Sequence, residues 1–386
     1  MLDEVPSGFV IPHVSLCIDA SCYRPGILKL LATIRPEWKH DTVKLKEFEG
    51  GLTNCLVGVK SGEDMLLVRI YGRNTEKFIN RESEIKNLVY LNKHIGTPPV
   101  YAHFDNGLCY GYVKGTPLEL NDLYDKMMMR RIARELARIH VLPSPDQDPE
   151  HTILYGSFFS SWLTEIPESL ETDIRTRRMK KLIGSVEELR RECDELKSHL
   201  DQLNSPIVFC HNDLTYRNII YSHDKVTFID LEYGGPNFRG FDIADFFCEF
   251  AGSDDVDFSL FPSRDYQLVW LRMYLEEAAL LRGENPNTVT DEMVEDLFVE
   301  VNQFTLACHM IWGIWGLIQT HYSLLDFDYL EYAELRIGEY RARRETCLTL
   351  KKIAKKNYDR ESRLCAFFNS FFCNKFLMIF TCIDFV

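Results

Sequence analysis

Closely spaced cysteine pairs are missing from this chain, although its 386 residues include 12 cysteines. No two of them form a C-x-x-C pattern, and Cys55, Cys109, Cys210 and Cys308 lie in apolar runs. Structural zinc sites and disulfide frameworks need closely spaced cysteines, whereas scattered thiols in apolar runs are typical of buried, reduced cysteine. The sequence therefore predicts neither a zinc site nor a disulfide-stapled fold, and it favours a cytoplasmic protein.

A basic surface and a secretory leader are missing as well. The formal net charge is −14, which argues against nucleic acid as a partner because phosphate backbones are bound by basic patches. An acidic surface also suits a cationic substrate. Residues Met1–Pro6 do not combine a basic segment with a long apolar run, so we expect no secretory signal. No internal repeat and no Gly/Ser linker divides the chain, whose length suffices for one two-lobed enzyme.

Residues 347–386 differ in composition from the rest of the chain. Their first part is basic and polar, and their second part, 367–386, is rich in Phe, Cys and Ile. A membrane helix needs about 20 apolar residues. The second part is interrupted by Asn369, Asn374, Lys375 and Asp384. We treat 347–386 as an atypical C-terminal tail, either a variant end or an anchor, and we do not expect membrane contact.

The most informative motif is a set of three polar residues at fixed spacing. Asp213 follows His211, Asn218 comes five positions after Asp213, and Asp230 comes seventeen positions after Asp213 at the end of an apolar run. Phosphoryl transfer from a nucleoside triphosphate needs this set: one carboxylate receives the proton of the attacking hydroxyl, while an amide and a second carboxylate hold Mg²⁺ on the phosphates. H-x-D-x-x-x-x-N followed by a strand and Asp is typical of the protein-kinase-like catalytic loop. A polar turn would explain one aspartate but not all three groups.

These three residues therefore receive distinct roles. We predict that Asp213 is the catalytic base and that Asn218 and Asp230 are ligands of Mg²⁺, which prefers hard oxygen donors. Glu232 is expected near the metal, reaching it through water. His211 is expected to support the loop rather than to act as an acid or base.

Hydrophobic periodicity predicts a small β-rich region followed by a helical one. Strands and one helix are expected in the order of a kinase N-lobe: strands at 42–48, 55–59 and 65–71, a helix at 75–94, and strands at 100–104 and 108–113. Beyond a short strand at 205–210 and a hairpin at 218–230, the rest reads as helical, at 127–140, 173–203, 264–281, 291–320 and 329–346. The predicted fold is α+β and bilobal, protein-kinase-like. It has a mostly β N-lobe with one key helix at 1–114 and a larger, mostly α C-lobe at 115–346.

Two features of the predicted N-lobe suit a nucleotide. Gly50-Gly51-Leu52-Thr53-Asn54 could cradle phosphates, because glycine lets backbone N–H groups approach an anion closely. It is not a G-x-G-x-x-G motif, and a Gly-Gly hairpin turn is the common alternative. Arg69 stands on the third strand, where kinases place a phosphate-binding lysine, and a guanidinium can bind phosphate bidentately. Glu82 is the predicted helix carboxylate that orients Arg69, with Glu84 as the alternative.

Longer blocks of the chain resemble the choline/ethanolamine kinase family. They span residues 230–249, 301–315 and 326–333, and the resemblance runs from about Pro25 to about Tyr340. It implies ATP and Mg²⁺ as cofactors and a small amino alcohol as substrate. It also implies a hinge at 110–113, with Tyr112, that offers backbone groups to adenine.

The resemblance further implies a pocket for the substrate's amine. Its predicted members are Tyr233, Glu249, Trp312, Trp315 and Tyr332. Aromatic faces attract an ammonium group through their quadrupoles, although a tryptophan pair at helical spacing is more often core packing. Asp242, Asp245 and Glu249 fall on one helix face, so at least one of them is expected to face the pocket.

The catalytic loop and Gly107–Tyr110 look closer to ethanolamine kinases than to choline kinases, because Tyr216-Arg217 precede Asn218. The resemblance therefore implies conversion of ethanolamine to phosphoethanolamine, the first step of the CDP-ethanolamine route to phosphatidylethanolamine. A choline kinase, an aminoglycoside-type phosphotransferase and a non-enzymatic pseudokinase are the alternatives. The intact catalytic set argues against the last. The sequence leaves the oligomeric state open, with a homodimer suggested by the resemblance alone.

Overall fold

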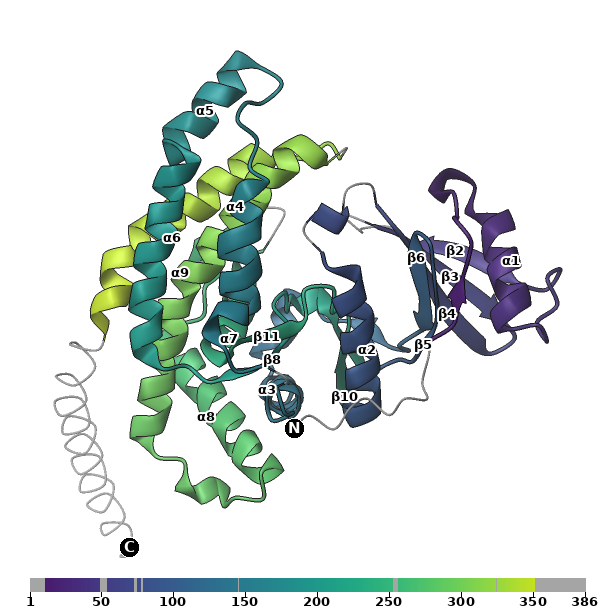
Figure 1. Ribbon diagram of the computed structural model, residues 1–386. Helices are drawn as coiled ribbons and strands as arrows, with labels where there is room; N and C mark the ends of the chain where they lie inside the picture. Colours follow the sequence, from purple (N-terminus) through teal and green to yellow (C-terminus); the bar gives the residue numbers. More distant parts are fainter. Residues whose placement is uncertain are drawn as a thin grey trace, which may run out of the picture.

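Two lobes make up the computed structural model, which describes residues 11–48, 54–72, 75–77, 79–144, 146–252, 256–323 and 325–350. A smaller lobe, purple to blue in Figure 1, is built on a six-stranded sheet, and a larger lobe consists mostly of helices. This arrangement confirms the predicted bilobal α+β fold. The predicted loop at Gly50–Thr53 and most of the predicted tail, 351–386, lie outside the described residues.

The sheet of the smaller lobe has the strand order β1-β5-β6-β4-β3-β2, and only the short β1–β5 pair is parallel among its described pairings. Its strands are β1 His13–Val14, β2 Lys44–Phe48, β3 Asn54–Ser61, β4 Asp64–Tyr71, β5 Val100–Phe104 and β6 Gly107–Gly111. Side chains alternate between the two faces of a strand. Leu66, Val68 and Ile70 of β4 are therefore buried in one core, while Leu67 and Arg69 face the space between the lobes. The five strands predicted here are confirmed.

Helices cover both faces of this sheet (Figure 1). Helix α1, Tyr23–Ile34, buries Ile27, Leu30 and Leu31 in the core under β3 and β4, and the sequence analysis did not predict it. Helix α2, Arg81–Ile95, lies on the side that faces the larger lobe. It begins six residues later than predicted, because Asn80 caps it with a bond from the Ser83 N–H, and it ends at Gly96, whose φ of 71° is left-handed.

The larger lobe is organised around α9, Asp291–Tyr322, most of whose residues are buried on all sides. The other helices are α3 Lys126–His140, α4 Trp162–Thr164, α5 Asp173–Ile183, α6 Val186–Leu200, α7 Arg239–Cys248, α8 Arg264–Leu281 and a last helix over 329–350, with a π-helical segment at Ile153–Ser161. The single helix predicted at 173–203 is wrong. Gly184, with φ 66° and ψ −86°, ends α5, and the Ser185 side chain caps α6.

Short strands of the larger lobe hold the polar motif. They are β7 Thr116–Pro117, β8 Ile207–Cys210, β9 Ile219–Ser222, β10 Lys225–Phe228 and β11 Gly235–Phe238. The predicted β9–β10 hairpin is present and turns at His223 and Asp224, both at positive φ. The motif therefore lies between β8 and β9, with Asp230 just after β10, so that strands anchor both ends of the loop.

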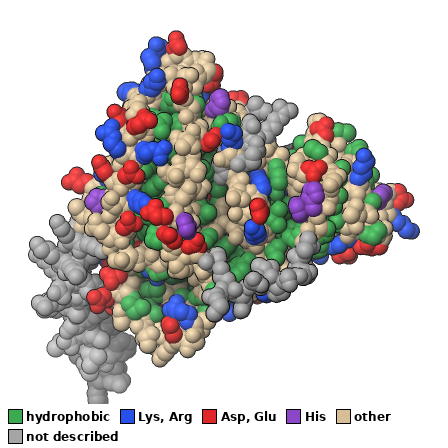
Figure 2. All heavy atoms as spheres, viewed as in Figure 1, with side chains coloured by type: hydrophobic (Ala, Val, Ile, Leu, Met, Phe, Trp, Pro, Cys, Tyr) green, Lys and Arg blue, Asp and Glu red, His purple; other side chains and the backbone are tan. Residues whose placement is uncertain are grey.

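Acidic and basic side chains are interspersed over the face shown in Figure 2 wherever residues are described. That face has no continuous basic surface within the described part of the chain. None of the helices among the described residues is both long and apolar enough to cross a membrane.

Candidate active site

A cavity of about 480 Å³ lies between the lobes. Strands β3, β4 and β6 line one side, and the motif loop, Glu249 and α9 line the other. Eleven of the predicted site residues line it: Asn54, Arg69, Tyr112, Asp213, Asn218, Asp230, Tyr233, Glu249, Trp312, Trp315 and Tyr332. The tertiary structure thus brings together groups that stand far apart in the sequence.

Two carboxylates of α7 hold the motif loop in place. Asp242 is fully buried and accepts the backbone N–H groups of His211 at 2.9 Å and Asn212 at 2.7 Å, as well as a bond with His140 Nε2 at 2.9 Å. Asp245 accepts the N–H of Leu214 at 3.0 Å. Each carboxylate is the hydrogen-bond acceptor for backbone N–H groups that water cannot reach. The loop backbone is therefore fixed before any substrate binds.

A left-handed residue turns the loop toward the cavity. Asn212 has a φ of 67°, which asparagine tolerates better than most residues. Its amide donates to the Tyr233 carbonyl at 2.8 Å and accepts from Asn237 at 2.7 Å, which ties the loop to the segment after Asp230. The side chain of His211 bonds the Ile229 carbonyl at 2.9 Å, so His211 has the predicted supporting position.

The Asp213 carboxyl lies in an acidic neighbourhood. Burial raises its pKa well above the ordinary aspartate range, and the Asp245, Glu249 and Asp230 carboxylates raise it further. A carboxylate with a raised pKa is a better proton acceptor, as a general base requires. The same crowding means that the cavity favours cations.

Asn218 and Asp230 present oxygen atoms near this base. The Asn218 amide nitrogen donates to the Asp213 carbonyl at 3.0 Å, so its amide oxygen is the atom that can ligate a metal. Asp230 has a left-handed φ of 62° and a side chain that is 40% exposed. Strained backbone at an aspartate beside a cavity is a frequent feature of functional sites. Both positions fit the predicted metal ligands.

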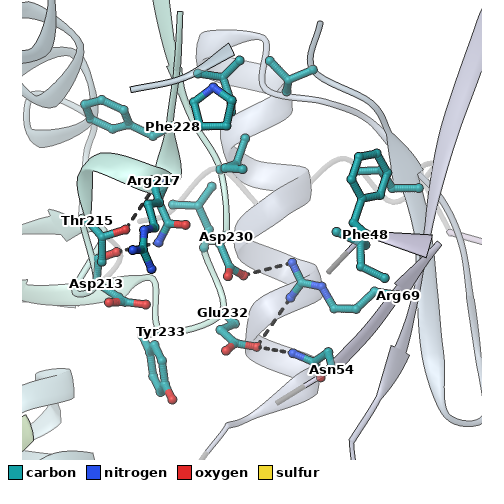
Figure 3. Close-up of a pocket in the computed structure, with 18 of the residues that line it drawn as sticks. Phe48, Asn54, Arg69, Asp213, Thr215, Arg217, Phe228, Asp230, Glu232 and Tyr233 are labelled. Carbon is teal, nitrogen blue, oxygen red and sulfur yellow. Dashed lines mark hydrogen bonds and ion pairs between the residues drawn. The ribbon is translucent and has the colours of Figure 1, made fainter. Parts of the chain in front are cut away.

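Arg69 is the centre of an ion-pair cluster between the lobes. Its guanidinium contacts Glu84 at 2.8 Å, Asp230 at 3.1 Å and Glu232 at 3.5 Å. Figure 3 shows Asp230 and Glu232 facing Arg69, with Asn54 donating to the same Glu232 carboxylate at 3.2 Å. Burial and Asp230 raise the pKa of Glu232 to about 7. Glu232 therefore belongs to this ion-pair cluster, next to Asp230, the predicted metal ligand.

The prediction that Glu82 orients Arg69 is wrong, and Glu84 does so instead. Glu84 is buried and its second oxygen bonds Arg81 at 2.9 Å, whereas the Glu82 side chain is 79% exposed and pairs with Lys86. Helix α2 begins at Arg81, and residues two positions apart on a helix point to different sides. Glu82 therefore points away from the sheet and Glu84 points toward it. Hydrophobic periodicity alone cannot decide between Glu82 and Glu84 when the first residue of the helix is predicted wrongly.

Arg81 is a site-forming residue that the sequence analysis did not identify. It bonds Glu232 at 3.3 Å, Asn54 at 3.3 Å and Thr75 at 2.8 Å, and its guanidinium stacks 3.9 Å from the centre of the Tyr71 ring. It thus joins α2 to the segment after β10. No sequence signal beyond a basic residue at a helix start pointed to it.

Aromatic rings form the end of the cavity beside Asp213. Trp312 lies 5.9 Å from Tyr233 and 6.0 Å from Trp315, and Trp315 lies 6.1 Å from Tyr332, all in edge-to-face geometry. Trp312 also donates its indole N–H to Asp245 at 2.7 Å. Both tryptophans are buried and line the cavity at the same time, so core packing and a role in the site are compatible.

One carboxylate belongs to this aromatic end. Glu249 follows α7 directly, and burial raises its pKa to about 7 against the lowering effect of Arg336. The three acidic residues predicted on one helix face therefore divide their roles: Asp242 and Asp245 hold the loop, and Glu249 lines the cavity. Phe327 also lines this end and was not singled out, although it lies within the resembling block 326–333.

The opposite end of the cavity is an apolar slot. Gly111, Tyr112 and Val113 line it where the chain leaves the N-lobe sheet, together with Leu67 of the neighbouring strand β4. Phe48 stacks on Tyr112 with ring centres 6.4 Å apart. The predicted adenine site at 110–113 thus lies beside apolar side chains of the cavity and stays a prediction.

Comparisons with known proteins agree with this geometry. The Choline/ethanolamine kinase family profile matches residues 45–341. The chain is 40% identical over 342 residues to ethanolamine kinase 2 from Homo sapiens, covering 87% of this chain and 85% of that protein. It is 41% identical over 350 residues to a probable ethanolamine kinase from Nematostella vectensis, covering 88% and 99%. Its structure is similar to that of a Plasmodium vivax ethanolamine kinase, with a TM-score of 0.68, 28% identity, and coverage of 78% and 82%.

Proposed function

Because this chain belongs to the choline/ethanolamine kinase family, we propose that it transfers the γ-phosphate of ATP to the hydroxyl of ethanolamine and forms phosphoethanolamine. The predictions of the family, the fold and a kinase acting on an alcohol are confirmed by the comparisons. One observation of the structure carries the proposal: a carboxylate with a raised pKa lies in the same cavity as an aromatic and acidic pocket.

Asp213 is the proposed general base. In the productive complex, its carboxylate accepts the proton of the substrate hydroxyl while the oxygen attacks the γ-phosphorus in line with the leaving group. The α7 carboxylates fix the loop that carries Asp213, so little reorganisation is needed at the moment of reaction. Arg69 is placed to bind phosphate oxygens once the nucleotide is present, because its guanidinium faces the cavity.

The acidic groups of the cavity fit a divalent cation. Asn218 and Asp230 would hold Mg²⁺, and both offer hard oxygen atoms. Arg69 pairs with Asp230 at 3.1 Å, and burial together with Asp230 raises the pKa of Glu232 to about 7. Bound Mg²⁺ supplies neutralisation of the charge on the phosphate oxygens.

The aromatic end suits a small ammonium group. Tyr233, Trp312, Trp315 and Tyr332 line this end of the cavity, and the face of an aromatic ring attracts a cation. Glu249 can accept a charge-assisted hydrogen bond. A primary ammonium has three N–H donors and can donate a hydrogen bond to the Glu249 carboxylate, whereas a trimethylammonium has no donor. This difference supports ethanolamine over choline as the preferred substrate.

The experiment is a substrate comparison under identical conditions. ATP consumption by the purified protein is measured with ethanolamine, choline and an aminoglycoside at equal concentrations, with the Asp213→Asn variant as a control for contaminating kinases. We expect the highest kcat/KM with ethanolamine and loss of activity in the variant. Mostly phosphocholine in a mixture of both alcohols would make this a choline kinase, and turnover of the aminoglycoside alone would refute the proposal.

Two further statements belong to the proposal. A cytoplasmic location is supported by the nine described cysteines, which are free thiols, seven of them at least partly buried. A homodimer follows from the family resemblance alone, and sedimentation of the purified protein would test it.

A further inference from the structure

A buried arginine lies behind the amine pocket. Arg336 stands one turn after Tyr332 on the helix over 329–350, and it is 0% exposed. Its Nε, Nη1 and Nη2 atoms have no hydrogen-bond partner among the described residues. Among the described residues, Arg336 forms an ion pair with Glu249, with Nη1 at 3.7 Å from Oε1. Its guanidinium also lies 5.7 Å from the centre of the Tyr332 ring.

Burying the Arg336 guanidinium in this way costs folding free energy, which suggests that its charge acts on a neighbouring group. A guanidinium remains protonated in proteins, and burying a charge without hydrogen bonds is strongly unfavourable. Core packing alone would be served better by an apolar side chain of similar length. Arg336 does not line the cavity, whereas Glu249 does. The charge of Arg336 therefore reaches the cavity through Glu249.

Glu249 needs such a partner because of where it lies. Asp245 and Asp213 are close enough that Glu249 raises the pKa of both carboxyls. Without a cation behind it, a buried carboxyl among two others would take up a proton and lose its attraction for an ammonium group. Arg336 and, to a smaller extent, the exposed Arg217 act in the opposite direction.

We propose that Arg336 is a positioning residue of the amine pocket, which favours the ionised form of Glu249 and orients it to accept the ammonium group of the substrate. This inference rests on the proposed function, since it concerns the amine that the pocket binds. Arg336 itself does not touch the substrate. A protein with a neutral residue at 336 is expected to bind nucleotide normally and amine poorly at neutral pH.

The pH dependence has a definite sign. Burial brings the pKa of Glu249 to about 7, and Arg336 is the largest lowering influence on it. Removing Arg336 raises that pKa, so that less Glu249 is ionised at neutral pH and the lost affinity returns as the pH rises. Among the described residues, the other charged or titratable groups around this site include Asp213, Arg217, Asp245, Cys248, Cys308, His309 and Tyr332.

The test uses four proteins that form a double-mutant cycle. They are the wild type, Arg336→Met, Glu249→Gln and the double variant, with Arg336→Lys added as a charge-retaining control. For each, KM for ethanolamine, KM for MgATP, kcat and melting temperature are measured. The profile of kcat/KM is recorded from about pH 6 to about pH 8.5, because kcat/KM reports ionisations of the free enzyme.

Arg336→Met is expected to raise the ethanolamine KM about tenfold near pH 7, with the MgATP KM changed less than about twofold. Its acidic limb of kcat/KM should move to higher pH, and Arg336→Lys should keep that limb near the wild-type position. In the Glu249→Gln background, Arg336→Met should change the ethanolamine KM by less than about twofold, because the residue acts through Glu249. The Glu249→Gln profile keeps the contribution of Asp213 and so isolates that of Glu249.

Three outcomes would overturn the inference: an equal effect of Arg336→Met in both backgrounds, an unmoved acidic limb, or a lower melting temperature with unchanged ethanolamine KM. If Arg336→Met does not fold, Arg336→Lys still decides, because a lysine variant whose acidic limb of kcat/KM is shifted to higher pH would exclude a role of the charge. Failure of the proposed function is a separate result, namely a wild type without ethanolamine turnover. The cycle is then repeated with the amino alcohol that the wild type phosphorylates, and a wild type that turns over none removes both proposals.

Discussion

Replacing Glu84 by glutamine tests whether the Arg69 cluster sets the geometry for phosphoryl transfer. Glu84 is 1% exposed, and its two oxygens contact Arg69 at 2.8 Å and Arg81 at 2.9 Å. The substitution keeps the shape of the side chain and removes its charge. Both guanidinium groups then lose their shared carboxylate, while Arg69 stays buried and Arg81 stays partly buried.

The expected magnitude follows from what remains around Arg69. Removing one partner of a buried ion pair costs about 3–5 kcal/mol. Because Asp230 and Glu232 remain within reach of Arg69 and glutamine still offers an oxygen, we expect a loss of about 2–4 kcal/mol of unfolding free energy. For a chain of this length that corresponds to a melting temperature lower by roughly 3–5 °C. We also expect kcat/KM for ATP to fall by about tenfold to hundredfold, since Arg69 loses its orientation.

The matched control is Glu82→Gln, two residues earlier on the same helix. Glu82 is exposed and pairs only with Lys86 among the residues that the structure describes, so neither melting temperature nor kcat/KM should change measurably. Steady-state kinetics with varied ATP and scanning calorimetry of the three proteins provide both quantities. An unchanged Glu84→Gln enzyme, or a Glu82→Gln enzyme with the larger defect, would refute this assignment of the helix carboxylate.

The remaining predictions concern the base, the metal, the amine pocket and pH. Asp213→Asn and Asp230→Asn should both abolish turnover without unfolding the protein, but nucleotide binding by calorimetry should depend on Mg²⁺ only while Asp230 is present. Trp312→Ala should raise the ethanolamine KM about two- to thirtyfold and leave the MgATP KM nearly unchanged, because a cation–π contact is worth about 0.5–2 kcal/mol; a lower melting temperature alone would mean that the ring is only core. Glu232 and Glu249 have pKa values raised to about 7, so the folded protein binds more protons than the unfolded chain between about pH 4.5 and about pH 7, and its stability without ligands should fall as pH rises through that range. Mg²⁺ with nucleotide should therefore raise the melting temperature more at pH 8 than at pH 6, and an equal or smaller increase at pH 8 would contradict the acidic cluster.

The grouping of the motif residues could be predicted from the sequence because they are close together in the chain. Asp213 and Asn218 share one loop, and the short, strongly patterned β9–β10 hairpin returns the chain to Asp230 beside that loop. Arg69 could be placed in the same way, by its position among apolar neighbours on β4. Local patterns also predicted the small sheet and most helices, since burial repeats every two residues in strands and about every 3.6 in helices.

Partners across the fold were decided only by the tertiary structure. The choice of Glu84 over Glu82 depended on where α2 begins, and the break between α5 and α6 depended on one glycine at positive φ. Arg81 and Arg336 carried no local signal, because a basic residue in a helix reads as a solvated charge until its surroundings are known. Their roles arise from carboxylates more than eighty residues away in the chain, Glu232 for the first and Glu249 for the second. Which charges are buried together is a property of packing in three dimensions, and the periodicity of a sequence records only which face of an element is apolar.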